Sequence, residues 1–135
     1  MQIMETMALF KALSDPHRLR IVSALAPGPL CVCHFEEIVE AEQVKVSKQL
    51  RYLKEQGVVT AERMAQWMVY SLAEPENAVL KAALEALQAD SDLADTLAED
   101  KKRRAAILSR ISESHGDPLE FIAANSGKDC CNWAC

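Results

Sequence analysis

Five cysteines fall in two short clusters of the 135-residue chain. Cys31 and Cys33 flank a single valine in LCVCHF, and Cys130, Cys131 and Cys135 lie in the closing DCCNWAC. Thiolates are soft ligands that favour thiophilic ions over magnesium or calcium. In a reducing compartment, an odd number of closely spaced cysteines fits thiolate ligands or redox groups better than a complete set of disulfides. We therefore expect the cysteines to carry the chemistry of this protein.

A trivalent arsenic or antimony centre needs three sulfurs to complete its pyramid. Cys31 and Cys33 supply two, and Cys130, Cys131 and Cys135 are the candidates for the third, within one subunit or across two. The rival hypothesis is a separate two-thiol site in the tail, which suits a methylated trivalent arsenical because its methyl group replaces one sulfur. In the remaining alternative, the tail is a loosely attached end and its cysteines are adventitious, without a role in binding.

The backbone around the first cysteine pair sets a geometric condition on binding. The pattern predicts a short helix over residues 31–39, with Phe35, Ile38 and Val39 facing inward. Side chains two residues apart on a helix point about 200° away from each other. We therefore expect that binding one atom through both sulfurs distorts the start of this helix. His34, next to the pair, is expected to be a surface or capping residue rather than a ligand.

Length and composition predict one compact domain without a membrane segment. Half of the residues are hydrophobic, and no apolar run reaches the length of about 18 residues that a membrane helix needs. The N-terminus has neither a basic leader nor a small-residue cleavage site, so we expect a cytoplasmic protein with no membrane partner. After residue 112 the composition shifts to small and polar residues. The expected organisation is a domain over residues 1–112 and a flexible, cysteine-containing tail over residues 113–135.

The net charge of −5 argues against a general nucleic-acid coat, but the charges are unevenly distributed. Residues 45–54 carry four positive side chains and no negative one, whereas residues 74–100 are strongly acidic. A second basic run, KKRR at residues 101–104, follows two acidic residues. Glu99 with Arg103 and Asp100 with Arg104 are spaced as i,i+4 ion pairs, so we expect this second run to be a solvated helix face.

The first half of the chain reads as four helices. Met7, Phe10 and Leu13 recur at helical spacing, and Ser14 ends that first helix. Asp15 and Pro16 then provide an N-cap and an N1 proline for a second helix, which stops at the APGP of residues 26–29. After the short helix at 31–39, a fourth helix ends at Gly57. Its inward-facing residues are expected to be Val46, Leu50 and Leu53.

The second half reads as a hairpin followed by two helices. Residues 58–63 and 67–72 are rich in strand formers and are separated by only three residues. Beyond Pro75, an apolar stripe and a longer helix over about residues 92–111 follow. The fold class predicted is mainly α with a small β-hairpin. The stripe is formed by Val79, Leu80, Ala83, Leu84 and Leu87.

Two short helices with a basic second member, followed by a hairpin, form a winged helix-turn-helix. The second helix of such a motif enters the major groove of DNA and the hairpin flanks it. Lysine and serine hold phosphates there, and glutamine reads an adenine edge. The candidate DNA-binding residues are Lys45, Ser47, Lys48, Gln49 and Arg51 on the helix, with Arg63 and Gln66 on the wing.

The segments SDPHRLRIVSAL, LCVCHF, VKVSKQLRYLKEQGVV and QWMVYSL resemble the ArsR/SmtB family of bacterial metal-responsive repressors, most closely its arsenic-sensing branch. The resemblance covers roughly residues 5–90. It implies a homodimer held together by the first helix and the helices after the wing. It also implies binding to double-stranded operator DNA of two-fold symmetry, and release of that DNA when a metal or metalloid binds.

Two departures from the family pattern bear on the inducer. Arsenic sensors of this branch carry a third cysteine three residues after the pair, where this chain has Glu36. The family's interface zinc site also finds no match, because residues 75–111 contain no histidine. Zinc sensing through that site is therefore not expected.

The sequence thus predicts a metalloid-responsive transcriptional repressor and not an enzyme. Its inducer is expected to be As(III), a methylated trivalent arsenical or Sb(III), with no permanent cofactor. One alternative is a Cd(II) or Pb(II) sensor of the same fold that uses four thiolates, and the other is a thiol redox-sensing repressor. A thiol oxidoreductase is disfavoured, because the chain has no C-x-x-C beside a βαβ pattern and no phosphate loop.

Overall fold

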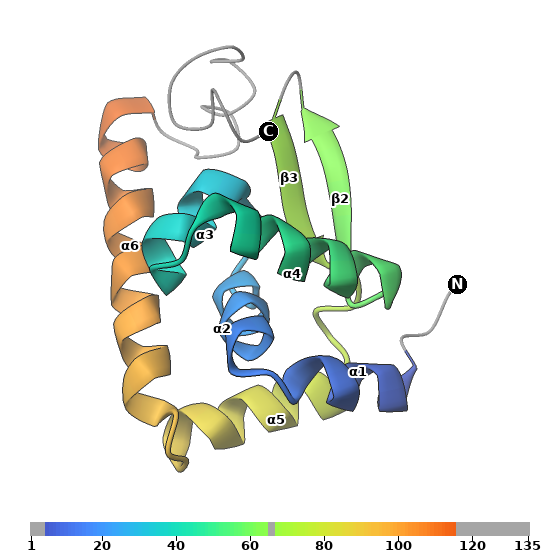
Figure 1. The fold of residues 1–135 in the computed structure, drawn as a ribbon. Coiled ribbons are helices and arrows are strands. Elements are labelled where there is room, and N and C mark those ends of the chain that lie inside the picture. Colours follow the sequence, from blue (N-terminus) through green and yellow to red (C-terminus); the bar gives the residue numbers. More distant parts are fainter. Residues whose placement is uncertain (1–4, 65–66, 116–135) are drawn as a thin grey trace.

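The computed structural model describes residues 5–64 and 67–115. Within these ranges the chain forms a helical body with a small antiparallel sheet at one end, and α6 runs along one side (Figure 1). The predicted fold class, mainly α with a small β-hairpin, is confirmed. The elements are α1 (Thr6–Leu13), α2 (Pro16–Leu25), β1 (Leu30–Cys31), α3 (Val32–Val39), α4 (Gln43–Glu55), β2 (Val59–Met64), β3 (Trp67–Leu72), α5 (Ala78–Ala89) and α6 (Ala94–His115).

The break between α1 and α2 follows from local chemistry. The Ser14 hydroxyl donates a hydrogen bond to the carbonyl of Lys11 at 2.6 Å, where α1 ends. The Asp15 side chain then accepts from the backbone N–H of Arg18 at 3.1 Å, and Pro16 occupies the first turn. The Asp15 side chain provides an acceptor for one of the unpaired N–H groups at the start of α2, and Pro16 has no N–H that needs an acceptor. The predicted boundary between α1 and α2 is confirmed.

Two residues with positive φ end the helices of the helix-turn-helix. Gly57 adopts φ 77° after α4, the left-handed conformation in which a glycine has no Cβ to clash. Glu40 adopts φ 52° at the end of α3, and its backbone N–H donates to the carbonyl of Glu36. These two stops fix the turn between α3 and α4 and the path from α4 into the wing.

The sheet has three strands in the order β1-β3-β2. The hairpin of β2 and β3 was predicted, but β1 was not. It pairs antiparallel with β3 through Leu30 opposite Tyr70 and Cys31 opposite Val69. The prediction of a helix starting at Cys31 is therefore wrong by one residue, because pairing with a strand far along the chain holds Cys31 in extended conformation. Helix α3 begins at Val32.

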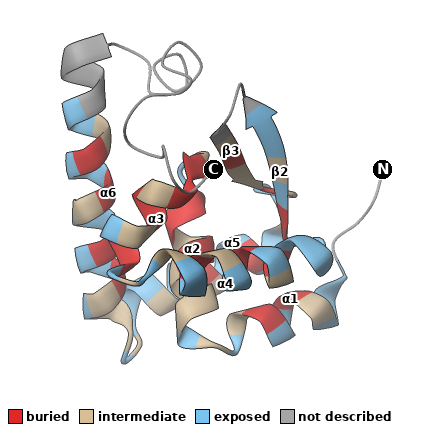
Figure 2. Cartoon of the chain, turned by 45° about the horizontal axis from the view of Figure 1, so that its top comes forward, coloured by how far each residue is buried: buried red, intermediate tan, exposed pale blue. Residues whose placement is uncertain are grey.

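Buried side chains gather where α2, α3 and α4 face one another (Figure 2). The inward positions predicted for α4 are confirmed, because Val46, Leu50 and Leu53 are all buried. Phe35 and Ile38 of α3 are buried as well. Burial of a large apolar side chain contributes about 1.5–3 kcal/mol, so these residues fix the position of α4 on the body.

The basic run at residues 101–104 divides into two kinds of side chain. Lys101 and Lys102 are exposed, as predicted, and Lys102 pairs with Glu99 at 3.6 Å. Arg104 is buried and donates to backbone carbonyls of the α2 end rather than to Asp100. The predicted i,i+4 pairs are therefore wrong, because α2 covers this face of α6 and offers acceptors that a helix-surface rule does not consider.

Asp100 is the buried carboxylate of α6, and it is paired with two arginines. It accepts two hydrogen bonds from Arg20 at 2.8 Å each and a third from Arg103 at 2.7 Å. The Nε of Arg103 also donates to the carbonyl of Ile38 at 2.7 Å. This network fastens α6 to α2 and to the C-terminal turn of α3.

In the part of the chain that the structure describes, no helix is sufficiently long and apolar to pass through a membrane.

Candidate metal centre and nucleic-acid interface

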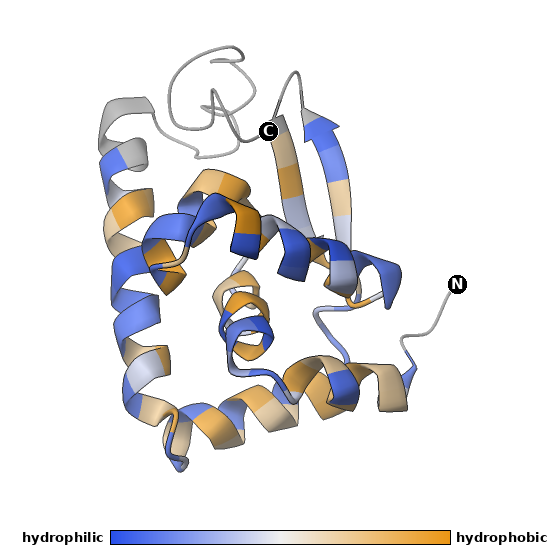
Figure 3. Cartoon of the chain, in the orientation of Figure 1, coloured by the Kyte–Doolittle hydropathy of each residue, from blue (hydrophilic) through white to orange (hydrophobic). Residues whose placement is uncertain are grey.

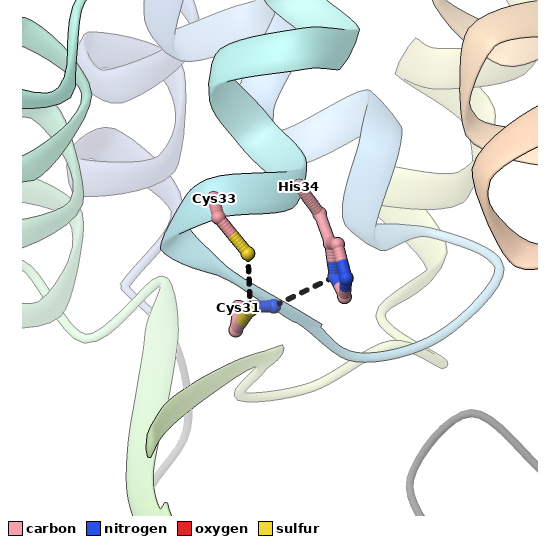
Figure 4. A group of neighbouring side chains, drawn as sticks. All are labelled: Cys31, Cys33 and His34. Atoms are coloured by element: carbon pink, nitrogen blue, oxygen red, sulfur yellow. Dashed lines mark hydrogen bonds between the residues drawn. The ribbon is translucent and has the colours of Figure 1, made fainter. Parts of the chain in front are cut away.

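Cys31 and Cys33 lie on either side of the junction between β1 and α3. Cys31 is the N-cap of α3 with extended backbone angles, φ −102° and ψ 169°, and Cys33 lies in the first turn. Their Sγ atoms are 3.1 Å apart (Figure 4). The expectation that the two sulfurs point apart is therefore wrong, because it assumed helical backbone at Cys31. The pair converges without any unwinding of α3.

The two sulfurs differ in their surroundings. Cys31 is fully buried, whereas Cys33 is half-buried at the surface of α3. Cys33 is disulfide-bonded in this structure and Cys31 is not its partner. Two thiolates at this junction therefore belong to the reduced form of the protein.

His34 caps the helix start and lies beside the sulfurs (Figure 4). Its Nδ1 accepts a hydrogen bond from the backbone N–H of Cys31 at 3.3 Å, so the predicted capping role is confirmed. The ring is buried rather than at the surface, and its Nε2 has no hydrogen-bond partner among the described residues. Cys31, Cys33 and His34 each place a ligand atom within 4.8 Å of the others. The burial of this ring beside the sulfurs departs from the expected surface position.

The tail cysteines Cys130, Cys131 and Cys135 lie outside the described residues. Their part in a shared or a separate site stays a prediction.

The outer face of α4 is polar, as its hydropathy shows (Figure 3). Lys45, Lys48 and Arg51 are exposed, and Ser47 and Gln49 are half-buried. In the wing, Arg63 on β2 is exposed, and Gln66 lies outside the described residues. An exposed basic face on the second helix of a helix-turn-helix matches the way that such helices contact phosphates and base edges.

Arg18 holds α4 against the first two helices. Its guanidinium lies over the Tyr52 ring at 4.2 Å, and its Nε and Nη2 donate to the carbonyls of Ala12 at 3.0 Å and Lys11 at 3.2 Å. Its Nη1 reaches the side chain of Gln49 at 3.5 Å. No local pattern in the sequence indicates a role for Arg18, because its partners on α1 and α4 come together only in the fold.

Glu36 joins α3 to the start of α4. Its carboxylate accepts a hydrogen bond from the backbone N–H of Gln43, the first residue of α4. Burial raises the pKa of Glu36, and the hydrogen bond from Gln43 opposes that rise. Its Oε2 is buried, and no residue in the described part of the chain forms a hydrogen bond with it. The residue that replaces the third cysteine of arsenic sensors is thus a link between the sulfur-bearing helix and the basic helix.

A family model described as bacterial regulatory protein, arsR family, matches residues 15–61. This segment contains α2, both cysteines of the pair and α4. A transcriptional repressor SmtB homolog from Synechocystis is 41% identical over 73 residues, which are 54% of this chain and 55% of that protein. The arsenic resistance transcriptional regulator ArsR1 from Pseudomonas putida is 36% identical over 93 residues, 64% of this chain and 72% of that protein.

Among solved structures, the transcriptional repressor BigR from Xylella fastidiosa superposes with a TM-score of 0.54 and 32% identity. The superposition covers 61% of this chain and 81% of that one. The chain thus spans little more than half the length of the SmtB homolog and most of the length of ArsR1 and BigR. These proteins are transcriptional regulators.

Proposed function

Because the chain belongs to the arsR family of bacterial regulatory proteins, a family of regulators and not of enzymes, we propose that it is a metalloid-responsive transcriptional repressor. A cytoplasmic homodimer binds operator DNA and is released when trivalent arsenic or antimony binds the thiolates of Cys31 and Cys33. The observation that carries this proposal is the 3.1 Å approach of the two sulfurs at the start of α3.

The spacing of the sulfurs suits a pyramidal centre. A central atom bonded to two sulfurs at about 2.3 Å separates them by about 3.3 Å for a right-angled bond angle and by about 3.8 Å for a tetrahedral one. The observed 3.1 Å is nearer to the first value. Trivalent arsenic and antimony form such pyramids with soft ligands. A third thiolate is supplied by Cys130, Cys131 or Cys135 in this proposal.

The DNA contact rests on α4 and the wing. In the proposed complex Lys45, Lys48 and Arg51 hold phosphates, and Gln49 reads a base edge in the major groove. Ser47 supports the phosphate contacts, and Arg63 with Gln66 belongs to the flanking wing. The exposure of the three basic side chains of α4 supports this assignment.

The homodimer rests on apolar side chains left exposed at α1 and α5. Met7 and Phe10 of α1 are 65% and 48% exposed, and Val79 of α5 is 39% exposed. Large apolar side chains grouped on two helices favour a protein interface over contact with water. A two-fold pair of subunits would present two copies of α4 to an operator of two-fold symmetry.

The coupling between inducer and DNA runs along α3 in this proposal. Arg103 holds the C-terminal turn of α3 through the carbonyl of Ile38, so the end of α3 that can respond is its start at the cysteines. Recruitment of a third ligand to the atom held by both sulfurs shifts this first turn, and Glu36 passes the shift to Gln43 at the start of α4. A coupling of about 1–3 kcal/mol lowers DNA affinity roughly 5- to 150-fold.

One alternative has its own supporting observation. The unpartnered Nε2 of His34 and the 4.8 Å grouping with both sulfurs favour a borderline-soft divalent ion, because imidazole and thiolate together suit such metals. In this version Cd(II) or Pb(II) is the inducer and tail cysteines complete the site. A thiol redox-sensing repressor is the other alternative, and release of DNA by peroxide without metal would support it.

The test is operator binding by fluorescence anisotropy under reducing conditions. We would titrate the complex with arsenite, a methylated trivalent arsenical, antimonite, cadmium, lead and zinc. The expected result is release by trivalent arsenic or antimony, lost in Cys31→Ser and in Cys33→Ser. Release only by divalent metals, lost also in His34→Gln, would favour the alternative. Release by none would contradict the proposal.

Truncation after Lys128 separates the two roles proposed for the tail. If Cys130, Cys131 or Cys135 completes the site, the truncated chain binds the operator normally but loses most of its response to arsenite. An intact arsenite response would exclude the shared site. Loss of the response to methylated arsenicals alone would support the separate two-thiol site.

A further inference from the structure

A cavity of about 280 Å³ opens between α2, α5 and α6, away from the cysteines. Its size is close to the lower end of the range of about 300–1,000 Å³ for small-molecule sites. Both α5 and α6 lie beyond residue 61, where the match to the family model ends. The apolar side chains of its walls are Ala24, Ala26, Pro27, Leu72, Leu80, Leu84 and Leu97.

Arg104 is one of the two buried charged side chains that line the cavity, together with Asp100. It is 9% exposed, and its Nε and Nη2 donate to the carbonyls of Ala24 at 2.8 Å and Gly28 at 3.1 Å. Its Nη1 makes no hydrogen bond within the described residues, and no described carboxylate pairs with it. A buried guanidinium is therefore held by neutral carbonyls, and its positive charge is not balanced by a carboxylate.

The carboxylates near the cavity do not supply that balance. Asp100 lines the cavity but accepts its hydrogen bonds from Arg20 and Arg103, two positive charges for one negative charge. Glu76 stands at the mouth, 86% exposed at its side chain and paired with Lys81 at 3.2 Å. Glu85 also lines the cavity and is exposed. The three carboxylates of the lining balance Lys81, Lys101 and Arg104 in number, but the buried one, Asp100, is bonded to arginines other than Arg104. A buried ion without a counter-ion is costly, and a ligand of opposite charge relieves that cost.

The cavity lies on a different side of α5 from the exposed apolar Val79. At 100° per residue, the cavity-lining Lys81, Leu84 and Gln88 of α5 share one side of the helix, and Val79 lies on the opposite side. The exposed apolar residue that supports dimerisation therefore does not share a surface with the cavity.

We propose that this cavity binds a small organic anion, a carboxylate with an apolar body. The carboxylate pairs with Nη1 of Arg104, and the apolar body lies between Leu80, Leu84 and Leu97. Lys101, exposed at the mouth, adds a second positive charge. Apolar wall residues combined with a few fixed polar groups are usual in a small-ligand site. This site is separate from the cysteine site and does not depend on it.

The test uses the full-length reduced protein and isothermal titration with octanoate. Octanol and octylamine have the same apolar body with a neutral and a positive head, so they isolate the role of charge. We expect octanoate to bind roughly tenfold or more tightly than octanol, because a charge-assisted hydrogen bond is stronger than a neutral one. Absence of octanoate binding, or equal binding of octanol, would overturn the proposal.

Variants place the binding in the cavity. Arg104→Gln is expected to weaken octanoate binding about tenfold or more, whereas Lys102→Gln, which removes one positive charge from the same helix outside the cavity, leaves it unchanged. Ala26→Trp at the exposed rim blocks the cavity without a change in the core. If Arg104→Gln does not fold, octanoate binding by Ala26→Trp and by Arg104→Lys tests the proposal instead. Unchanged binding in Ala26→Trp would overturn the proposal.

Discussion

Two basic runs, at residues 45–54 and 101–104, are similar in composition and differ in surroundings. The lysines and arginine of the first run project from α4 into solvent. Both arginines of the second run donate hydrogen bonds inside the protein. Arg103 donates to Ile38 and to Asp100, and Arg104 donates to the end of α2. The positive charge of α4 is thus available to a polyanion, whereas much of that on α6 is used to hold the fold.

The difference shows what a count of charges omits. A basic side chain is available to bind DNA only if its N–H groups are not already bonded to acceptors inside the protein. For Arg104 the acceptors are backbone carbonyls at the end of a helix about 80 residues away. Removing charges from each run, with stability and DNA affinity measured separately, tests whether the two runs have different roles.

The largest expected effect comes from the second run. Asp100→Ala removes the buried partner of Arg20 and Arg103, so we expect the free energy of unfolding to fall by about 2–4 kcal/mol. Urea unfolding of the reduced protein measures this. The matched control is Glu99→Ala, an exposed neighbour paired with Lys102, expected to cost less than about 0.5 kcal/mol. Equal losses in the two variants would contradict the structural role of Asp100.

The next effect comes from the first run. The double variant Lys45→Gln and Lys48→Gln should weaken operator binding by tenfold or more at unchanged stability. The slope of log affinity against log salt should fall by about one per lost phosphate contact. The control is Lys101→Gln with Lys102→Gln, expected to leave affinity within about twofold, because α6 does not contact DNA in this proposal. Equal losses of operator affinity in the two double variants would contradict the different roles of the two runs.

A smaller effect is expected from Arg18, which positions α4 without belonging to its basic face. Arg18→Gln removes the contacts with Tyr52, Ala12 and Lys11. We expect a loss of about 1–2 kcal/mol in stability and a weaker operator affinity, with the salt slope unchanged. A fall in the salt slope would instead make Arg18 a phosphate contact.

The smallest effect concerns His17 near the start of α2. Burial first, then Lys45 and Arg20, lowers its pKa from 6.5. The folded protein therefore binds this proton less readily than the unfolded chain, so stability is lost as the pH falls from above 6.5 through the lowered pKa. His17→Gln should flatten this acid-side loss in urea unfolding at a series of pH values. An unchanged pH profile would contradict it.

Local chemistry made much of the fold predictable. The Asp15 and Pro16 start of α2, the inward face of α4 and the stop at Gly57 each depend on neighbours within one or two helical turns. The convergence of Cys31 and Cys33 was missed because a two-residue strand has no periodicity, and only its pairing with β3 makes it extended. The burial of Arg104 was missed for the same reason, since its acceptors on the end of α2 are distant in sequence.

Arsenic K-edge X-ray absorption measures whether the two sulfurs at the start of α3 bind the inducer. The reduced protein is loaded with equimolar arsenite, desalted and compared with the double variant Cys31→Ser and Cys33→Ser. The account predicts a first shell of sulfur in the intact chain and little retained arsenic in the variant. An equal amount of arsenic with the same sulfur shell in the variant would contradict it.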